Sequence, residues 1–137
     1  MATGPTNIKS IAVSVDDLIA AVEATANGSD TVLRVTPPFS GRMRARLHVV
    51  QPQASDDETI HIEPSSLLDA DAPAYPTPDG TADELRAAED ETYSVERHRS
   101  YHERQIAAWR DAIPAHVADS VALEAVGHDV SVSLLGP

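Results

Sequence analysis

Arginine recurs at alternate positions in one short run, Arg42-Met43-Arg44-Ala45-Arg46-Leu47-His48. Alternate side chains of an extended strand leave the same face, so we expect the three arginines and His48 to lie together. Guanidinium groups bind carboxylates and phosphates through paired hydrogen bonds. Arg34 belongs to the strand that we expect beside this one. The pattern predicts a site for an anionic or acidic partner, built from Arg34, Arg42, Arg44, Arg46 and His48.

The same arginine row has a second interpretation, because like charges on one strand face repel one another. Acidic residues are concentrated just after the row: residues 51–93 carry twelve acidic side chains and one arginine. Some of these carboxylates could neutralise the arginines from within the chain. The sequence leaves both interpretations open.

The loop before the arginine row, Pro37-Pro38-Phe39-Ser40-Gly41, contains the only phenylalanine of the chain. Its two prolines restrict the backbone. An aromatic side chain on a stiff loop tip suits a pocket of a partner, which makes Phe39 a candidate binding residue. The alternative is that Phe39 folds back onto the core.

His98 and His102 are four residues apart on an expected helix, so their rings share one helix face. They could bind one metal ion, with Glu103 or Glu91 assisting. However, the order His-Arg-Ser-Tyr-His-Glu differs from the His-Glu-x-x-His pattern of metalloproteases, and no third ligand is indicated. Both histidines lie on an apolar stripe, which favours buried, hydrogen-bonded side chains. We predict no catalytic residue, cofactor or metal, and retain His98, His102 and Glu103 as the metal candidates.

The composition indicates a protein that stays hydrated in concentrated salt. The formal net charge is −12, Lys9 is the only lysine, and Asp outnumbers Glu. Such a charge opposes compaction in dilute buffer, whereas at about 1 M salt the screening length falls to about 3 Å and the repulsion largely disappears. Binding to nucleic-acid phosphates weakens steeply with salt, so a nucleic-acid partner is disfavoured.

The chain has no cysteine, which excludes disulfides, thiolate metal ligands and cysteine nucleophiles. Its first residues lack the basic and apolar regions of a secretory signal. No apolar run approaches the length of a membrane span. We expect a cytoplasmic protein that does not bind membranes.

Capping residues and hydrophobic spacing place the first elements. Ser14, with Asp17 three residues later, predicts a helix start, and Asn27-Gly28 predicts the end of that helix. Residues 31–36 and 42–50 alternate in polarity around a five-residue loop, which is typical of a hairpin. Residues 59–63 predict a third strand.

Prolines and acids dominate residues 64–80, which we expect to form a loop or linker. The capping box Thr81-Ala82-Asp83-Glu84 predicts a short helix, and a long helix follows over residues 94–113. Gly127-His128 predicts a two-residue turn between strands at 121–126 and 130–135. These elements predict a single α+β domain over residues 1–137, with an antiparallel-rich sheet of about five strands packed on the N-terminal helix and the long helix.

Three segments together resemble a known family: the run from Leu33 to His48, Tyr75-Pro76-Thr77-Pro78-Asp79, and Asp83-Glu84-Leu85-Arg86. The chain is similar to small uncharacterised proteins of haloarchaea that are grouped as a domain of unknown function. The resemblance spans most of the chain and implies a cytoplasm of high salt. It implies no activity and no site residues.

We therefore expect a non-enzymatic binding module that uses an arginine-faced hairpin to engage an anionic or acidic partner. One alternative is a metal-binding protein or hydrolase centred on His98 and His102. Another is a structural subunit of a larger assembly, in which the acidic, proline-rich segment wraps a neighbour. The sequence leaves the oligomeric state open.

Overall fold

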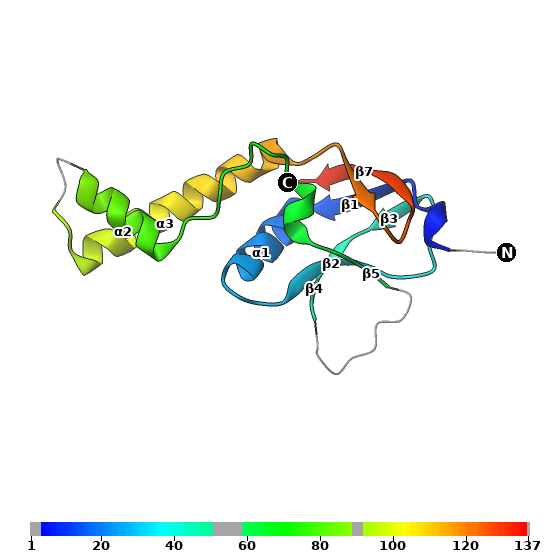
Figure 1. Cartoon of the computed structure of the whole chain (residues 1–137), viewed down its shortest axis with the longest axis horizontal. Coiled ribbons are helices and arrows are strands. Elements are labelled where there is room, and N and C mark those ends of the chain that lie inside the picture. The colour runs from blue at the N-terminus through cyan, green and yellow to red at the C-terminus, as the bar shows by residue number, and fades with distance from the viewer. Residues whose placement is uncertain (1–3, 51–58, 89–91, 137) are drawn as a thin grey trace. The chain divides into compact units, whose positions relative to one another are not determined.

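The computed structural model describes residues 4–50, 59–88 and 92–136. The chain divides into two units, the first made of residues 1–70 and 116–137 and the second of residues 71–115. The described residues form three α-helices and two β-sheets (Figure 1), which confirms the predicted α+β class. That residues 1–137 form one domain stays a prediction.

Four strands of the first unit form a mixed sheet, which we call sheet A. Its members are β1 (Ser10–Ser14), β3 (Arg42–Arg44), β6 (Ser120–Leu123) and β7 (His128–Leu135), in the order β3-β1-β7-β6. β1 runs parallel to both of its neighbours, whereas β6 and β7 form an antiparallel hairpin. Along β1, Ile11 and Val13 are buried, while the residues between them face the other side of the sheet.

The other three strands form an antiparallel sheet, which we call sheet B. Its members are β2 (Thr31–Val35), β4 (Arg46–Val49) and β5 (Ile60–Ile62), in the order β4-β2-β5. Thr31, Leu33 and Val35 are buried on β2, and Ile60 and Ile62 are buried on β5. The prediction of one sheet of about five strands is therefore wrong in detail, because the described residues form seven strands in two sheets.

The predicted strand over residues 42–50 is broken at Ala45. Its first half, β3, pairs with β1 in sheet A, and its second half, β4, pairs with β2 in sheet B. Ala45 has no exposed surface, and its N–H donates to the carbonyl oxygen of Ala12 at 2.9 Å. Because the chain changes sheets at a buried alanine, the alternation of residues 42–48 does not continue along one strand face.

The helix α1 (Val15–Ala26) covers the core of the first unit. Ser14 caps it, since its Oγ accepts from the Asp17 N–H at 3.0 Å, as the capping pattern predicted. Gly28, at φ +93°, follows the helix end in the left-handed conformation that glycine tolerates. Leu18 and Ala21 are buried, and α1 packs against β2 and β4. Figure 1 labels α1 and the strands β2 and β4 that it contacts.

The chain leaves the first unit and returns to it at neighbouring points. After the 3-10 helix η2 (Pro64–Leu67), Leu68 forms an antiparallel bridge with Val117. The Asp69 N–H donates to the carbonyl of His116, and the Ala118 N–H donates to the carbonyl of Leu67, both at 2.8 Å. A His116–Asp69 side-chain contact of 3.1 Å adds to this pairing.

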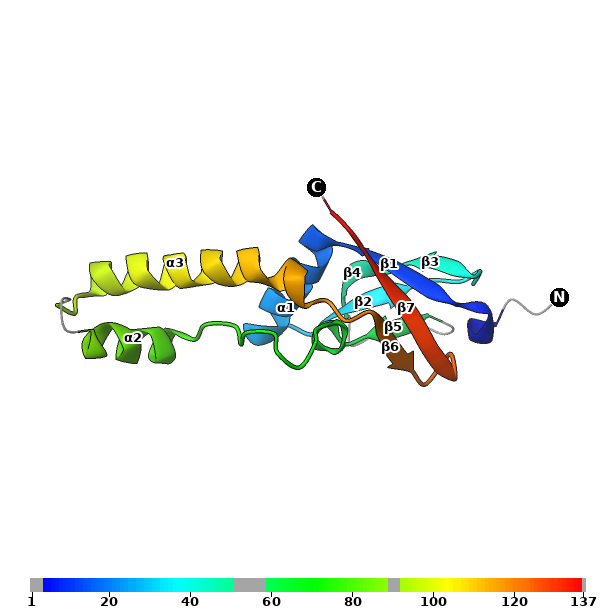
Figure 2. The same cartoon turned by 90° about the horizontal axis from the view of Figure 1, so that it is seen from above.

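The second unit is a helical hairpin of α2 (Pro78–Ala87) and α3 (Val95–Ala112), which lie side by side in Figures 1 and 2. Thr77 caps α2 and Pro78 occupies its first turn, so the helix begins earlier than the predicted capping box at Thr81. Threonine is favourable at the N-cap and proline at the first helical position, so α2 starts at Pro78 and not at Thr81. α3 confirms the long helix predicted over residues 94–113.

Trp109 anchors the proline-rich segment to α3 within the second unit. Its Nε1 donates to the Pro73 carbonyl at 3.0 Å, and Tyr75 packs edge-on against its ring with centroids 4.9 Å apart. Only 4% of Trp109 is exposed. Residues 73–75, which pack on Trp109, form what we call the proline-rich strap. Residues 64–80 thus include η2, this strap and the first turn of α2, which makes them more than a linker.

Two shorter features complete the fold. The 3-10 helix η1 (Pro5–Asn7) precedes β1, and the 3-10 helix η3 (Ile113–His116) follows α3. The predicted C-terminal hairpin is present as β6 and β7, but four residues connect the strands, Glu124 to Gly127, instead of two. Gly127 has φ +86°, so glycine serves the turn as expected.

Candidate functional site

Sheet B presents basic side chains on the face opposite its buried residues. Directly opposed residues of neighbouring strands share a face. Arg34 on β2 is opposed by Arg46 on β4 and by His61 on β5, and Val32 is opposed by His48. Alternation along each strand puts these residues on the face away from Leu33. We call Arg34, Arg46, His48 and His61 the cationic face.

The two histidines of the cationic face approach each other across β2. Their ring centroids are 5.7 Å apart, with the ring planes inclined at 44°. Arg46 and His61 are exposed, whereas Arg34 and His48 are half-buried and the Nε2 atom of His48 is buried. Thr59 Oγ1 lies 3.5 Å from His61 Nε2. Arg46 and His61 thus lie on the two outer strands of sheet B, and Arg34 lies between them on β2.

The cationic face carries two permanent positive charges, those of Arg34 and Arg46. Two guanidinium groups are directly opposite each other at Arg34 and Arg46, and like charges in that relationship destabilise a sheet. Guanidinium groups accept no hydrogen bond, so their natural partners are carboxylates and phosphates. Each such anion can bridge two arginines and reduce their repulsion.

The structure separates Arg42 and Arg44 from the other predicted site residues. Both are exposed on β3 and lie beside Ser10 and Ala12 of β1, on a face of sheet A. Among the residues that the structure describes, no carboxylate forms an ion pair with Arg42, Arg44 or Arg46. The single face predicted for Arg42, Arg44, Arg46 and His48 is therefore wrong, because the strand is divided between two sheets.

Phe39 does not form an exposed loop tip. Only 5% of its surface is accessible, so it belongs to the core, as the alternative interpretation held. Next to it, Ser40 Oγ donates to the Arg42 carbonyl at 2.8 Å and closes the loop locally. The role of Phe39 as an anchor for a partner has no support in this geometry.

His61 is a member of the cationic face that sequence reasoning missed. It lies between two buried isoleucines, Ile60 and Ile62, and is itself exposed. His61 lies opposite Arg34 because β5 pairs with β2. These strands are far apart in the sequence, and hydrophobic periodicity does not predict which strands pair. A search for basic residues on every predicted strand would have found it.

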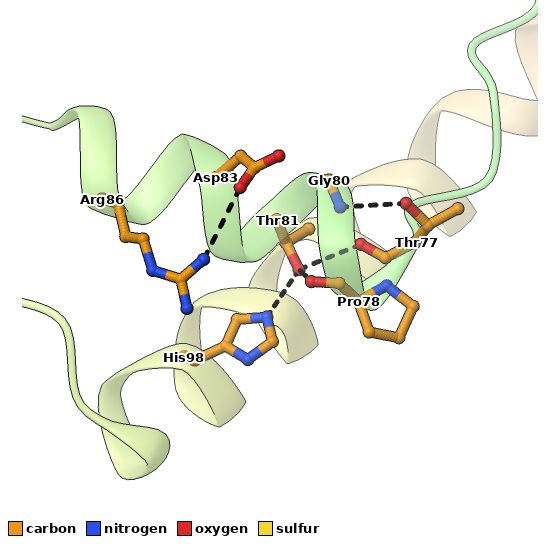
Figure 3. A network of polar contacts seen from close by, with 7 residues as sticks. All are labelled: Thr77, Pro78, Gly80, Thr81, Asp83, Arg86 and His98. Carbon is orange, nitrogen blue, oxygen red and sulfur yellow. Dashed lines mark hydrogen bonds and ion pairs between the residues drawn. The ribbon is translucent and has the colours of Figure 1, made fainter.

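His98 and His102 form a second cluster, within the helical hairpin. Both rings contact the hydroxyl of Thr81: Oγ1 lies 2.9 Å from His98 Nε2 and 2.8 Å from His102 Nδ1. The same oxygen lies 3.1 Å from the Thr77 carbonyl and 3.2 Å from that of Pro78. Figure 3 shows His98 and the helical turn around Thr81, which is only 3% exposed.

The number of available protons limits which atoms of this cluster donate and which accept. A hydroxyl has one proton to donate, so it cannot serve two imidazole nitrogens that both accept. At least one histidine therefore donates to Thr81, and the hydroxyl proton is free to bond a carbonyl when both donate. The arrangement joins α2 to α3, since Thr81 belongs to one helix and both histidines to the other.

An aromatic and charged layer adjoins His98. Tyr93 lies 5.9 Å from the His98 ring, and the Arg86 guanidinium lies 4.3 Å from the centre of the Tyr93 ring. Arg86 also contacts Asp83 at 3.6 Å, as Figure 3 shows. His98 thus has a tilted aromatic ring beside it, and a cation lies over the Tyr93 ring.

The metal hypothesis receives no third ligand in the part of the chain that the structure describes. Within residues 4–50, 59–88 and 92–136, no group of three or more histidine, aspartate or glutamate side chains could hold a metal ion. Glu103 is exposed, and Glu91 lies outside the described residues. One ring nitrogen of each histidine, Nε2 of His98 and Nδ1 of His102, is hydrogen-bonded to Thr81.

Comparison with known proteins identifies the family. Residues 1–136 match the model of a domain of unknown function, DUF8009, and the chain belongs to this family. No curated protein and no solved structure matches the chain significantly. Among the described residues, every helix is too short or too polar to cross a membrane.

Proposed function

We propose that the protein is a non-enzymatic binding module whose cationic face engages an anionic or acidic partner. One observation carries the proposal: Arg34 is flanked in register by Arg46 on one side and by His61 on the other. The whole chain has only ten lysines and arginines against 22 acidic residues, so the directly opposed arginines concentrate a scarce charge. A partner that supplies carboxylate or phosphate oxygens would bind Arg46 and compete for Arg34, which already makes an interaction within the chain.

We further propose that this binding takes place in a cytoplasm of high salt. The support is compositional: a net charge of −12, a single lysine and an excess of Asp over Glu. At about 1 M salt, charges interact only over about 3 Å, so long-range steering is lost. Paired guanidinium–oxyanion hydrogen bonds act at contact distance and retain their geometry there.

The competing explanation is neutralisation by the chain itself. The segment between β4 and β5 contains Asp56, Asp57 and Glu58, which lie outside the described residues. If these acids occupy the cationic face, then the triple change Asp56→Asn, Asp57→Asn and Glu58→Gln should strengthen the binding of an added anion. If an external partner is the natural ligand, then the triple variant should bind with nearly unchanged affinity.

The test uses a defined probe, a hexa-aspartate peptide, with calorimetry for affinity and amide NMR shifts for location. The double variant Arg34→Gln/Arg46→Gln should lose at least ten-fold in affinity. The double variant Arg42→Gln/Arg44→Gln is the matched control, because it removes the same charge from sheet A. Circular dichroism checks that both variants fold. Equal losses, or shifts that avoid β2, β4 and β5, would contradict the proposal.

A further inference from the structure

We propose that the acidic partner is an extended peptide segment that adds to sheet B as a further strand beside β4, and that its acidic and apolar residues alternate. This inference rests on the proposed function and names the kind of partner. It joins two properties of one edge strand. Part of the β4 backbone is not bonded to β2, and the strand carries Arg46 on one face and the exposed Leu47 and Val49 on the other.

The backbone of β4 directs alternate groups away from sheet B. Among the described residues, β4 has β2 on one side and no strand on the other. The Val50 N–H, just beyond the strand, donates to the Asp30 carbonyl at 2.8 Å, whereas the Leu47 N–H donates to the side chain of Asp17. In an antiparallel pair, bonding to the neighbouring strand alternates from residue to residue. The N–H and C=O groups of Leu47 and Val49 therefore point away from β2.

The residue opposite Val49 agrees with this direction. Val49 is opposed to Thr31, whose N–H donates to the Ser29 carbonyl at 3.1 Å and whose carbonyl accepts from the Thr25 hydroxyl at 3.2 Å. In the part of the chain that the structure describes, the Val49 N–H has no hydrogen-bond partner. A peptide in extended conformation can supply the missing carbonyl oxygen, which is how strands add to an exposed sheet edge.

The two faces of β4 differ in chemistry and so determine the alternation of the partner. Leu47 and Val49 lie on the face of the buried Leu33 but are 36% and 46% exposed, because β4 is an edge strand. Arg46 lies on the opposite face and is exposed. An added strand places its own side chains alternately on these two faces. Its apolar residues would extend the core face, and its acidic residues would form hydrogen bonds with the Arg46 guanidinium.

Asp17 competes with the partner for the same edge. Its Oδ2 lies 3.3 Å from the Leu47 nitrogen, which is longer than the usual distance of about 2.9 to 3.0 Å for such a bond. This carboxylate must leave the Leu47 N–H before a peptide carbonyl can accept from it. Its negative charge also repels an acidic peptide. Asp17 therefore weakens strand addition without preventing it.

The added strand should run antiparallel to β4. The described strands of sheet B all pair in this way, and antiparallel pairs are slightly more stable per residue than parallel pairs. In this orientation the peptide residues that oppose Leu47 and Val49 exchange both backbone hydrogen bonds with them. These are the apolar residues of the peptide. Their N–H groups therefore point towards β4, whereas the N–H groups of the acidic residues point away from it.

The probe is a hexapeptide of alternating aspartate and valine with blocked ends. Its control has the same composition and charge, but the aspartates and the valines form two separate blocks. Calorimetry in concentrated salt should show about ten-fold tighter binding of the alternating peptide, because only that peptide satisfies both faces of β4. Methylation of its valine nitrogens should abolish this advantage, since it removes the N–H groups that point towards β4. Methylation of its aspartate nitrogens should preserve the advantage.

Variants of the protein locate the added strand. Asp17→Ala should bind the alternating peptide about five-fold more tightly, the factor that one net hydrogen bond represents. Asp16→Ala removes the same charge from an exposed site of the same helical turn and is the control. Arg46→Gln should weaken binding, whereas Arg44→Gln on sheet A should not. Hydrogen exchange of the Val49 N–H should slow in the complex. The methylated peptides require no change in the protein, so they decide the question if a variant fails to fold.

The possible results separate strand addition from the proposed function. Equal affinities for the two peptides, or equal effects of the two methylations, would overturn strand addition. The proposed function would still stand in that case if Arg34→Gln/Arg46→Gln abolished binding. Unchanged hydrogen exchange at Val49 in the complex would also overturn strand addition. If neither these peptides nor hexa-aspartate bound, both claims would be refuted together.

Discussion

The Asp17 carboxylate accepts a hydrogen bond at 3.3 Å from the backbone N–H of Leu47, thirty residues further along the chain. Asp17 lies in the first turn of α1, and Leu47 lies on β4, an edge strand of sheet B. Edge strands expose unpaired N–H groups that invite another chain to pair with them. Asp17 occupies one of these groups, beside the partly exposed Leu47 and Val49.

Replacing Asp17 with Ala should lower the free energy of unfolding by about 1 kcal/mol, the typical value of one such hydrogen bond. The cap of α1 should persist, because it uses the backbone N–H of Asp17 and the hydroxyl of Ser14. Urea unfolding in concentrated salt measures the change. Asp16→Ala is the control, since Asp16 is an exposed acid of the same turn; equal losses for both would assign the effect to the helix dipole instead.

Thr81→Val should destabilise the helical hairpin by about 1 to 3 kcal/mol, because it leaves His98 and His102 without their shared hydroxyl. Valine matches threonine in shape and has a similar helix propensity. Thr81→Ser keeps the hydroxyl and should cost less. Unfolding followed by Trp109 fluorescence compares the two variants. If valine proves nearly harmless while serine destabilises the hairpin, the methyl packing matters and the hydrogen bonds do not.

Tyr101 should ionise above the usual tyrosine range. Its pKa is raised first by partial burial, then by the negative charge of Glu84 and by the hydrogen bond to Glu84 at 3.3 Å, while Arg104 acts in the opposite direction. The folded protein therefore binds this proton more tightly than the unfolded chain. Its contribution to stability is present at lower pH and disappears as the pH rises through the folded-state pKa.

Ultraviolet absorbance of tyrosinate measures this ionisation, and Tyr101→Phe identifies the band that belongs to Tyr101. Glu84→Gln should move that band to lower pH, because it removes the charge that opposes the phenolate. An unchanged titration in Glu84→Gln would leave burial as the whole cause.

Trp109, the only tryptophan, should report on the packing of the proline-rich strap. Since its ring is 4% exposed, the emission of the folded protein should be that of a shielded indole and should resist acrylamide quenching. Tyr75→Ala should shift the emission to longer wavelength and cost about 1 kcal/mol, the usual value of an aromatic pair. Tyr93→Ala, in the same hairpin but against His98, should leave the emission unchanged.

Local signals predicted most elements of this fold. The start of α1 needs only Ser14 and the residues that follow it, and its end needs only Gly28. The extended character of residues 31–35 and 60–62 also follows from their alternation. Each of these predictions depends on contacts within a few residues, which is why the sequence was sufficient.

The candidate site depended on long-range pairing and was predicted only in part. Nothing in the alternation of residues 42–48 distinguishes one strand from two strands that join different sheets at Ala45. Likewise, the same apolar side chain can face a partner or the core, and Phe39 faces the core. His61 joins Arg34 only because β5 pairs with β2.

The pairing of residues 67–69 with residues 116–118 brings together the two points between which the helical hairpin is inserted. A short flexible linker can therefore replace residues 71–115 without stretching the remaining chain. We therefore expect that the hairpin can be exchanged for another module. A fluorescent or affinity module grafted at the same junction should leave the connectivity of the two sheets unchanged.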